Sequence, residues 1–349
     1  AGNVSVDGGT IKLDGNFPTG GSNVALGDTA LDSVTTAGNN VAIGSSALTA
    51  ITENGANTAV GAAALDANTA AFNTALGFDA LGANTTGTPN TAVGANTLNA
   101  NTTGGSNTGV GYNALGANTT ADNNTGVGKD ALGANTTGTQ NTAIGALTSG
   151  VSTTQSYNTA VGYGVLYQNT ASNNTGVGHE ALDANTSGSE LVAVGQGALG
   201  ANTTGAQNTA VGRKALEVNT TGSSNTAVGQ RALDANTEGD ENTALGKAAL
   251  GSNTTANSNT AVGSSALLDN TTGNNNVAVG RQALTNNTTA SKNTVVGSIA
   301  MQANTTGASN TAVGYAALDA NTEGDQNVAL GQGALGSNTT ANNNTAVGY

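Results

Sequence analysis

The sequence has 349 residues, of which 52 are Gly and only 8 % are charged, and it contains neither Cys nor Trp. A globular domain is roughly a quarter charged, so this composition argues against one, and the lack of Cys excludes a disulfide framework and a Cys nucleophile. A net charge of −13 argues against nucleic acid as a partner, and no apolar run is long enough to predict membrane insertion of this segment.

Residues 1–22 stand outside the pattern that fills the rest of the chain. Their apolar residues are strand-like and are separated by Asp-Gly turns, which predicts a cap or a donor strand. We therefore divide the sequence into this N-terminal segment and a repeat domain over residues 23–349. The strand-forming residues of the segment are Val4, Val6, Ile11 and Leu13.

The repeat domain is built from one short unit. The string NTAVG and its variants end in Gly at 20 places, and 17 of the 19 intervals have the same length, as from Gly27 to Gly44, while the other two are shorter by one position. The consensus is NTAVGxxALxANTTGxx, and its positions are numbered 1 to 17 below. A unit this short and rich in Gly suits one coil with a rise of about 4.8 Å. We therefore predict an all-β fold, a parallel β-solenoid of about 20 coils.

Positions 2 to 4 are predicted to form a strand that ends at a glycine corner. Position 4 is Val, Ile or Leu in all 20 copies and position 2 is Thr or Val, residues that suit a pleated strand. We expect these two positions to face the core. Position 5 is Gly in every copy, as at Gly94 and Gly111, which predicts positive φ or a close approach of backbone at the corner.

The second half of the unit is predicted to supply the main core residue and a polar ladder. Position 9 is Leu in 17 of 19 coils, and we expect it to fill the core from a second short strand. Position 12 is Asn in 16 of 19 coils, and stacked Asn side chains can form hydrogen bonds from rung to rung. The representative core and ladder residues are Leu81, Leu98, Leu115, Asn84, Asn101 and Asn118.

Several of these Asn residues also begin Asn-Thr-Thr sequons for glycosylation, for example Asn84 and Asn304. A sugar could be attached only if the Asn faced solvent. Position 1 is Asn in 19 of 20 copies without needing a sequon, so we favour an inward ladder over glycosylation.

Position 3 is small and never polar: Ala in 16 copies, Gly in three and Val in one. Alternation places it opposite positions 2 and 4, hence outward. An outward apolar row predicts lateral packing against another copy of the chain, and the open coil at the end predicts axial association with the N-terminal segment as donor strand. The predicted assembly residues beyond that segment are Ala25, Ala160, Ala210, Ala261, Val347 and Tyr349.

Candidate chemical groups are sparse in this sequence. His179 is the only histidine and lies at a variable position beside Glu180, so we interpret it as a solvated surface residue. The acidic turns at 238–241 and 323–325 lack the spacing of a calcium loop. We expect no catalytic residue, no metal and no cofactor.

The coil that follows Gly145 departs from the pattern. It has Ser149 in place of the core Leu and Ser152 in place of the ladder Asn. Three tyrosines occur in or just after it, at 157, 163 and 167. They could form a contact site or fill the space left by the missing Leu, and both interpretations stay open.

The strand strings NVAIG at 40–44 and NVALG at 23–27 and 327–331, together with NTAVG, resemble the head repeats of trimeric autotransporter adhesins. Similar NTAVGxxAL units occur in phage tail-fibre proteins. The resemblance covers residues 23–349 and implies a left-handed parallel β-roll, a homotrimer, an extracellular or cell-surface location and a ligand on a host surface or matrix. The unit here is longer than that of the adhesins.

The function expected from these observations is structural and non-enzymatic: an extracellular fibre or rod, as an adhesin-like appendage or a self-assembling filament. The expected partner is the chain itself, as a homotrimer or a head-to-tail homopolymer. An alternative is the shaft of a phage tail fibre on a virion surface. Ice binding is less favoured, because adjacent Thr residues in the turn point in opposite directions if extended. Glycan cleavage needs paired carboxylates, whereas the carboxylates here are scattered over different rungs.

Overall fold

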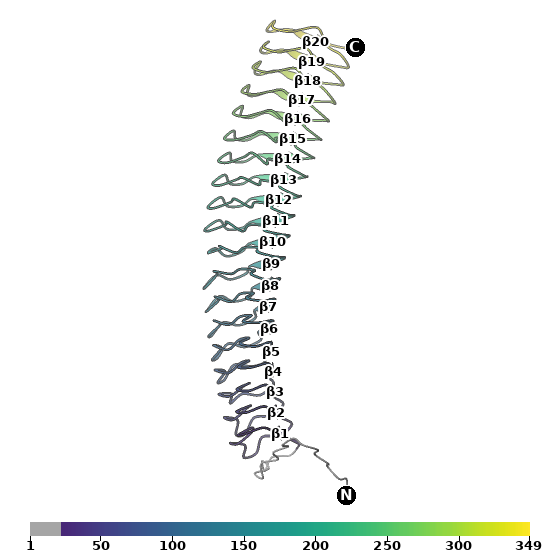
Figure 1. The fold of residues 1–349 in the computed structure, drawn as a ribbon. Coiled ribbons are helices and arrows are strands. Elements are labelled where there is room, and N and C mark those ends of the chain that lie inside the picture. Colours follow the sequence, from purple (N-terminus) through teal and green to yellow (C-terminus); the bar gives the residue numbers. More distant parts are fainter. Residues whose placement is uncertain (1–21) are drawn as a thin grey trace, which may run out of the picture. The chain divides into compact units, whose positions relative to one another are not determined.

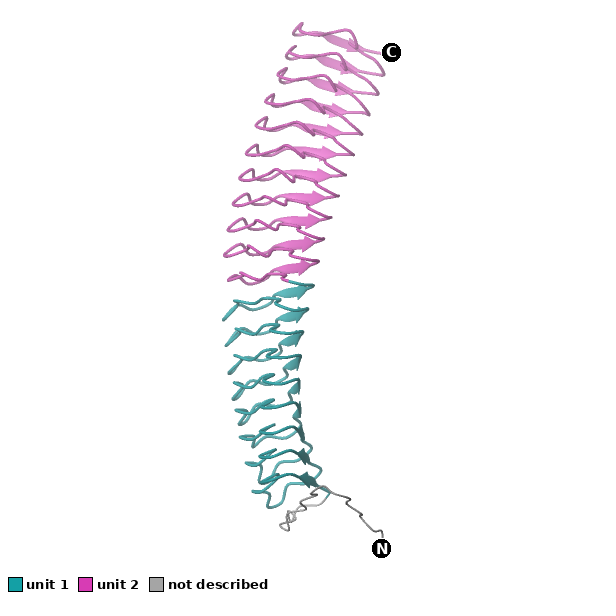
Figure 2. Cartoon of the chain, viewed as in Figure 1, with its two compact units in different colours: residues 1–163 teal, residues 164–349 magenta. Residues whose placement is uncertain are grey.

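The computed structural model describes residues 22–349, and this part of the chain is an all-β parallel solenoid of about 19 turns without a helix. The predicted fold class is therefore confirmed. The chain divides into two compact units, residues 1–163 (unit 1) and residues 164–349 (unit 2), which are coloured separately in Figure 2.

Every strand is three residues long and occupies positions 2 to 4 of a repeat. Unit 1 contains β1 (Val24–Leu26), β2 (Val41–Ile43), β3 (Thr58–Val60), β4 (Thr74–Leu76), β5 (Thr91–Val93), β6 (Thr108–Val110), β7 (Thr125–Val127), β8 (Thr142–Ile144) and β9 (Thr159–Val161). Unit 2 contains β10 (Thr175–Val177), β11 (Val192–Val194), β12 (Thr209–Val211), β13 (Thr226–Val228), β14 (Thr243–Leu245), β15 (Thr260–Val262), β16 (Val277–Val279), β17 (Thr294–Val296), β18 (Thr311–Val313), β19 (Val328–Leu330) and β20 (Thr345–Val347).

Within each unit, successive strands pair in parallel and in the register of the repeat. Thr209 of β12, for example, lies opposite Thr226 of β13, and Ala210 lies opposite Ala227. Figure 1 shows the strands of each unit stacked as successive rungs. Because the register follows the repeat, every side chain lies above its counterpart in the preceding coil.

The glycine at position 5 is required by the backbone at the corner. Gly94 has a φ of 132°, a conformation that L side chains rarely adopt. A Cβ atom on Gly94 would lie 2.5 Å from the carbonyl oxygen of Gly111 in the next coil. Both reasons predicted for this residue, positive φ and close approach, therefore apply.

The segment after the corner is a series of turns, so the prediction of a second strand at position 9 is wrong. Asn96 and Leu98 both have left-handed φ angles, 57° and 52°, whereas an extended strand needs negative φ. The backbone still binds its neighbours here, since the Leu98 amide donates to the carbonyl of Ala114 in the next coil at 3.0 Å. Left-handed backbone costs Leu roughly 1–2 kcal/mol, and burial of its side chain offsets that cost.

The core lies on the other side of the strand from the side expected. Position 3 points inward and is fully buried, as at Ala210, whereas positions 2 and 4 point outward. The reason is the narrow interior of the coil. Leu216 at position 9 and Ala215 at position 8 fill the interior from the opposite side, which leaves space only for a small side chain on the strand.

Departures from Ala at position 3 show how closely this interior is filled. Gly176 follows the coil in which position 8 is Val165, and a Cβ on Gly176 would lie 2.5 Å from the Val165 Cγ1 atom. Val295 is the one Val at position 3, and its coil also carries the one Met of the sequence, Met301, in place of Leu. Both are fully buried, and a flexible Met suits an irregular space.

Two ladders of Asn side chains close each coil. The Asn101 side-chain amide at position 12 donates to Asn84 Oδ1 of the preceding coil at 2.7 Å and to the Gly104 carbonyl at 2.9 Å. At position 1, the Asn90 side chain donates to the same Gly104 carbonyl at 2.9 Å, and its Oδ1 accepts from the Asn107 backbone amide of the next coil. These bonds join the coil to itself and to both neighbours.

Candidate functional site

The strand face is the first candidate surface. We use this name for the outward side chains of positions 2 and 4 on the strands of one unit. Position 4 presents a row of Val, Leu and Ile side chains, such as Val194, Val228 and Val313, which are 37–38 % exposed. Position 2 presents mostly Thr in a parallel row. Each unit thus carries a regular face that is half apolar and half hydroxyl-bearing.

The alanines predicted to mediate lateral assembly do not lie on this face. Ala160, Ala210 and Ala261 are fully buried, and Ala25 in the first described coil is partly buried. The prediction that position 3 provides an outward apolar row is therefore wrong, because this row lines the core. A Lys at any of these positions would test folding rather than association.

The residues predicted for axial assembly fall in two groups. Val347 at the end of β20 is 75 % exposed, and Tyr349 is 99 % exposed. The four residues of the predicted donor segment, Val4, Val6, Ile11 and Leu13, lie outside the described residues.

The structure places all the representative core and ladder residues in the interior. The leucines 81, 98 and 115 are fully buried, as are Asn84, Asn101 and Asn118. The Asn118 side-chain nitrogen donates to Asn101 Oδ1 at 2.8 Å and to the Ala121 carbonyl at 3.1 Å. A sugar would have to displace both bonds, so these Asn residues serve the ladder.

The carboxylates of the acidic turn at 238–241 accept hydrogen bonds from the neighbouring coils. Asp240 Oδ1 accepts from the Ser223 amide at 2.7 Å, and Glu241 Oε2 accepts from the Ser258 hydroxyl at 3.1 Å, both across one coil. Among residues 22–349, no three His, Asp or Glu side chains are grouped so that they could hold a metal ion. No helix in the same range is long and apolar enough to span a membrane.

The coil that follows Gly145, called the irregular coil below, has a buried polar interior. Ser149 and Thr148 occupy positions 9 and 8, and the Thr148 hydroxyl donates to the Gly145 carbonyl at 2.8 Å. Asn135 Oδ1 of the preceding coil is buried and has no hydrogen-bond partner within the described part of the chain, because Ser152 replaces the Asn that would donate to it. The tyrosines 157, 163 and 167 are exposed, so they do not fill the interior.

A second candidate surface was missed by the sequence analysis. We call it the corner column: the side chains at position 6 of unit 2, directly after the glycine corner. Every second coil has a large cationic or aromatic residue, and the coils between them have Gln or Ser. The large residues, all of them exposed, are His179, Arg213, Lys247, Arg281, Tyr315 and Tyr349.

The charges beside the corner column are paired with each other. Lys214 Nζ lies 2.8 Å from Glu217 Oε1, and Arg231 Nε lies 2.6 Å from Asp234 Oδ2. The hydrogen bond and the negative charge of Asp234 raise the pKa of Arg231. The acids Glu217 and Asp234 at position 10 are thus neutralised by the cations at position 7 of the same coils.

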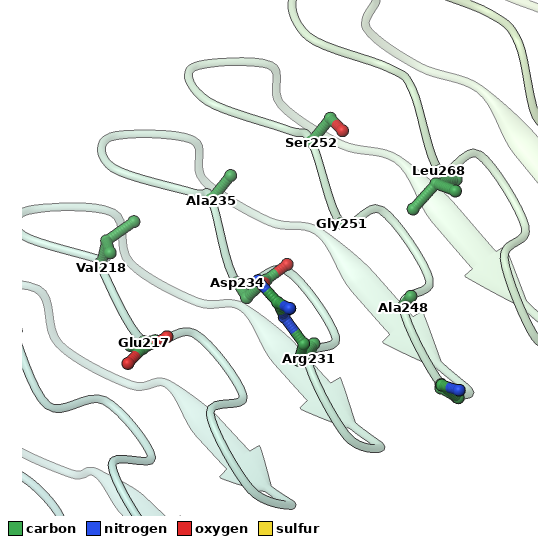
Figure 3. Close-up of a pocket in the computed structure, with 10 residues that line it drawn as sticks. Glu217, Val218, Arg231, Asp234, Ala235, Ala248, Gly251, Ser252 and Leu268 are labelled. Atoms are coloured by element: carbon green, nitrogen blue, oxygen red, sulfur yellow. The ribbon is translucent and has the colours of Figure 1, made fainter.

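Two open hollows lie over glycines at position 10. One has a volume of about 610 Å³ and lies over Gly251, between the Arg231–Asp234 pair and Leu268. Figure 3 shows Arg231 directed toward Asp234, with no side chain at Gly251. Lys247 also lines this hollow.

A second hollow, of about 450 Å³, lies over Gly200 and is lined by the acids Glu180, Asp183 and Glu217. Burial is the main cause that raises the pKa of Asp183, and the negative charge of Glu180 raises it further. The two hollows differ in charge. Two cations, Arg231 and Lys247, and two acids, Glu217 and Asp234, line the first, whereas three acids and no cation of the described range line the second.

No protein-family model matches the chain, and no curated protein has a significantly similar sequence.

Proposed function

We propose that this chain is a non-enzymatic structural protein whose solenoid units form part of an extracellular fibre, as an adhesin-like appendage or a self-assembling filament. One observation carries the proposal: hydrogen bonds of the backbone and of the side chains bind each coil to the next. The sheet, both Asn ladders and the Thr hydroxyls of position 13 all bridge neighbouring coils, as at Thr203, whose hydroxyl donates to the Thr220 carbonyl at 3.0 Å. Such a unit is suited to transmit force along its axis.

The strand face is the surface through which copies associate in this proposal. It holds one half-exposed aliphatic side chain per coil in an unbroken row within each unit. A regular apolar row of this length is costly to leave in water, and the flat parallel face is compatible with closed packing of several copies around one axis. The same arrangement would serve the shaft of a phage tail fibre on a virion.

Sedimentation of the full chain over a range of concentrations tests this proposal. We expect an oligomer, and we expect Lys at Val194, Val228 and Val313 to dissociate it. Lys at three exposed turn residues, Thr204, Thr221 and Thr306, adds the same charge and is the control, expected to leave the oligomer intact. A native chain that stays monomeric at high concentration would refute association through the strand face.

Ice binding is a second candidate because of one observation. The Thr row of position 2 lies on the outward face in the register of the repeat, as in the pairing of Thr243 with Thr260, rather than in the core as expected. A flat array of hydroxyl and methyl groups at one fixed spacing could order water. Thermal hysteresis that Thr243→Lys abolishes would support this candidate, and its absence in the native protein would eliminate it.

A further inference from the structure

We infer that the corner column of unit 2 binds an extended acidic polysaccharide that carries one negative charge per disaccharide. The inference goes beyond the proposed structural role and concerns a different surface from the strand face. It rests on unpaired cations at a fixed spacing, on the hydroxyl and amide groups between them, and on the hollow beside Lys247.

Within residues 22–349, the three cations of the column have no carboxylate partner, although the Arg281 guanidinium donates to Gln282 Oε1 at 2.6 Å. Arg213, Lys247 and Arg281 are exposed, and in the part of the chain that the structure describes none of them forms an ion pair with a carboxylate. Glu217 in the coil of Arg213 is bound by Lys214, and Asp234 in the next coil is bound by Arg231. The coils that begin with Lys247 and Arg281 contain no Asp or Glu. The column is therefore a local line of positive charge on an acidic chain.

The spacing of the cations selects the ligand. Arg213, Lys247 and Arg281 are separated by two coils each, which corresponds to about 9.6 Å at a rise of about 4.8 Å per coil. Phosphates in a nucleic acid strand lie much closer together, at about 3.4 Å of helix axis per charge. A linear glycan with an acidic sugar alternating with a neutral one has sparse charges at about the spacing of the cations.

The groups between the cations suit the neutral sugar. Gln230 and Ser264 occupy the intervening coils of the column and are exposed, so their amide and hydroxyl groups can form hydrogen bonds to sugar hydroxyls. Beside the middle cation, the hollow over Gly251 is bounded by apolar Leu268 and by polar Ser252. Its two acids, Glu217 and Asp234, are paired with Lys214 and Arg231. A concave surface with both kinds of lining is typical of a ligand site.

A second copy of the chain fits this column less well. The acidic groups on the opposite edge of unit 2 lie in three turns. The equivalent residues Glu190 and Glu241 are three coils apart, and Glu238 and Glu323 are five coils apart. Cations two coils apart cannot meet acids three or five coils apart in one register. The spacing therefore favours an external polymer over self-association.

The test is the binding of a fluorescent hyaluronan decasaccharide, which has one carboxylate per disaccharide, to the full chain at low salt. Dextran is the neutral comparison. We expect binding to hyaluronan that weakens with salt, and an affinity about tenfold lower when all three cations of the column are changed to Gln. Circular dichroism checks that each variant keeps its fold.

Two matched variants make the test specific. Lys247→Gln combined with Gln230→Lys keeps the charge but breaks the spacing, and we expect it to weaken binding as much as Lys247→Gln alone. Lys292→Gln removes a cation from the opposite edge and is expected to leave binding unchanged. Hyaluronan binding no stronger than dextran binding, or a spacing variant that binds as well as the native chain, would overturn the inference.

Discussion

The inner and outer surfaces of a coil differ in how far their residues vary. Facing inward, position 3 is Ala in 16 of 20 copies and position 9 is Leu in 17 of 19 coils. Facing outward, position 6 carries nine residue types over the 20 coils, from Asp and Lys to Tyr. The inner surface repeats because each residue must fit the coil above and below it, whereas the outer surface is free to vary, and specific binding is therefore expected on the outside.

The largest difference between the surfaces should appear when one side chain is shortened on each. Leu216→Ala removes a fully buried side chain and is expected to lower the free energy of unfolding by about 2–5 kcal/mol. Val228→Ala on the strand face is the control, with an expected loss of less than about 1 kcal/mol. Urea denaturation measures both, and equal losses would contradict the assignment of inner and outer faces.

A smaller effect of opposite sign is expected at the irregular coil. Asn135 Oδ1 is buried there without a partner in the described range, and Ser152→Asn restores the ladder donor. We expect the stability to rise by about 1 kcal/mol, measured by thermal denaturation. The control is Ser224→Asn at an exposed turn, where no change is expected; a Ser152→Asn variant less stable than the native chain would refute the ladder argument.

The smallest effect concerns the acidic hollow over Gly200. The pKa of Asp183 is raised, chiefly by burial and further by Glu180, so the folded state binds this proton more tightly than the unfolded state does. Its charge is therefore unfavourable to folding at neutral pH, and the penalty is relieved as the pH falls through the raised pKa. Because solvent screens a partly exposed carboxylate, Asp183→Asn should raise stability at pH 7 by only up to about 0.5 kcal/mol.

Stability measured from pH 7 down to the ordinary pKa range of Asp checks this effect. The gain from Asp183→Asn should shrink as the pH falls. Asp269→Asn, which removes one exposed carboxylate, is the control for the loss of a single negative charge. A gain that grows with acidity would contradict the direction of the shift.

The sequence alone was sufficient for the fold class, the Gly corner and the Asn ladder, because each depends on a property of one residue type. The inward face of the strand was predicted wrongly, because the large side chains of positions 2 and 4 were taken to indicate burial. The absence of polar residues from position 3 in all 20 copies was the better indicator of burial. At Ala210, for example, the interior opposite Leu216 has space only for a small side chain.

Two other features could not be found in the averaged repeat. Leucine is a poor indicator of left-handed backbone, so the turn at Leu98 looked like a strand. The corner column repeats every second coil, and a consensus built over single coils averages Arg213 with Gln230. A search at twice the period would have detected it.

The most direct test of the account is the accessibility of three consecutive residues of β11. The chain has no Cys, so single Cys variants at Val192, Ala193 and Val194 can be labelled with a maleimide without background, at a dilution where sedimentation shows no association. We predict rapid labelling at 192 and 194, which are 37 % exposed, and protection at 193, which is fully buried. Rapid labelling at 193 with protection at 192 and 194 would contradict the account.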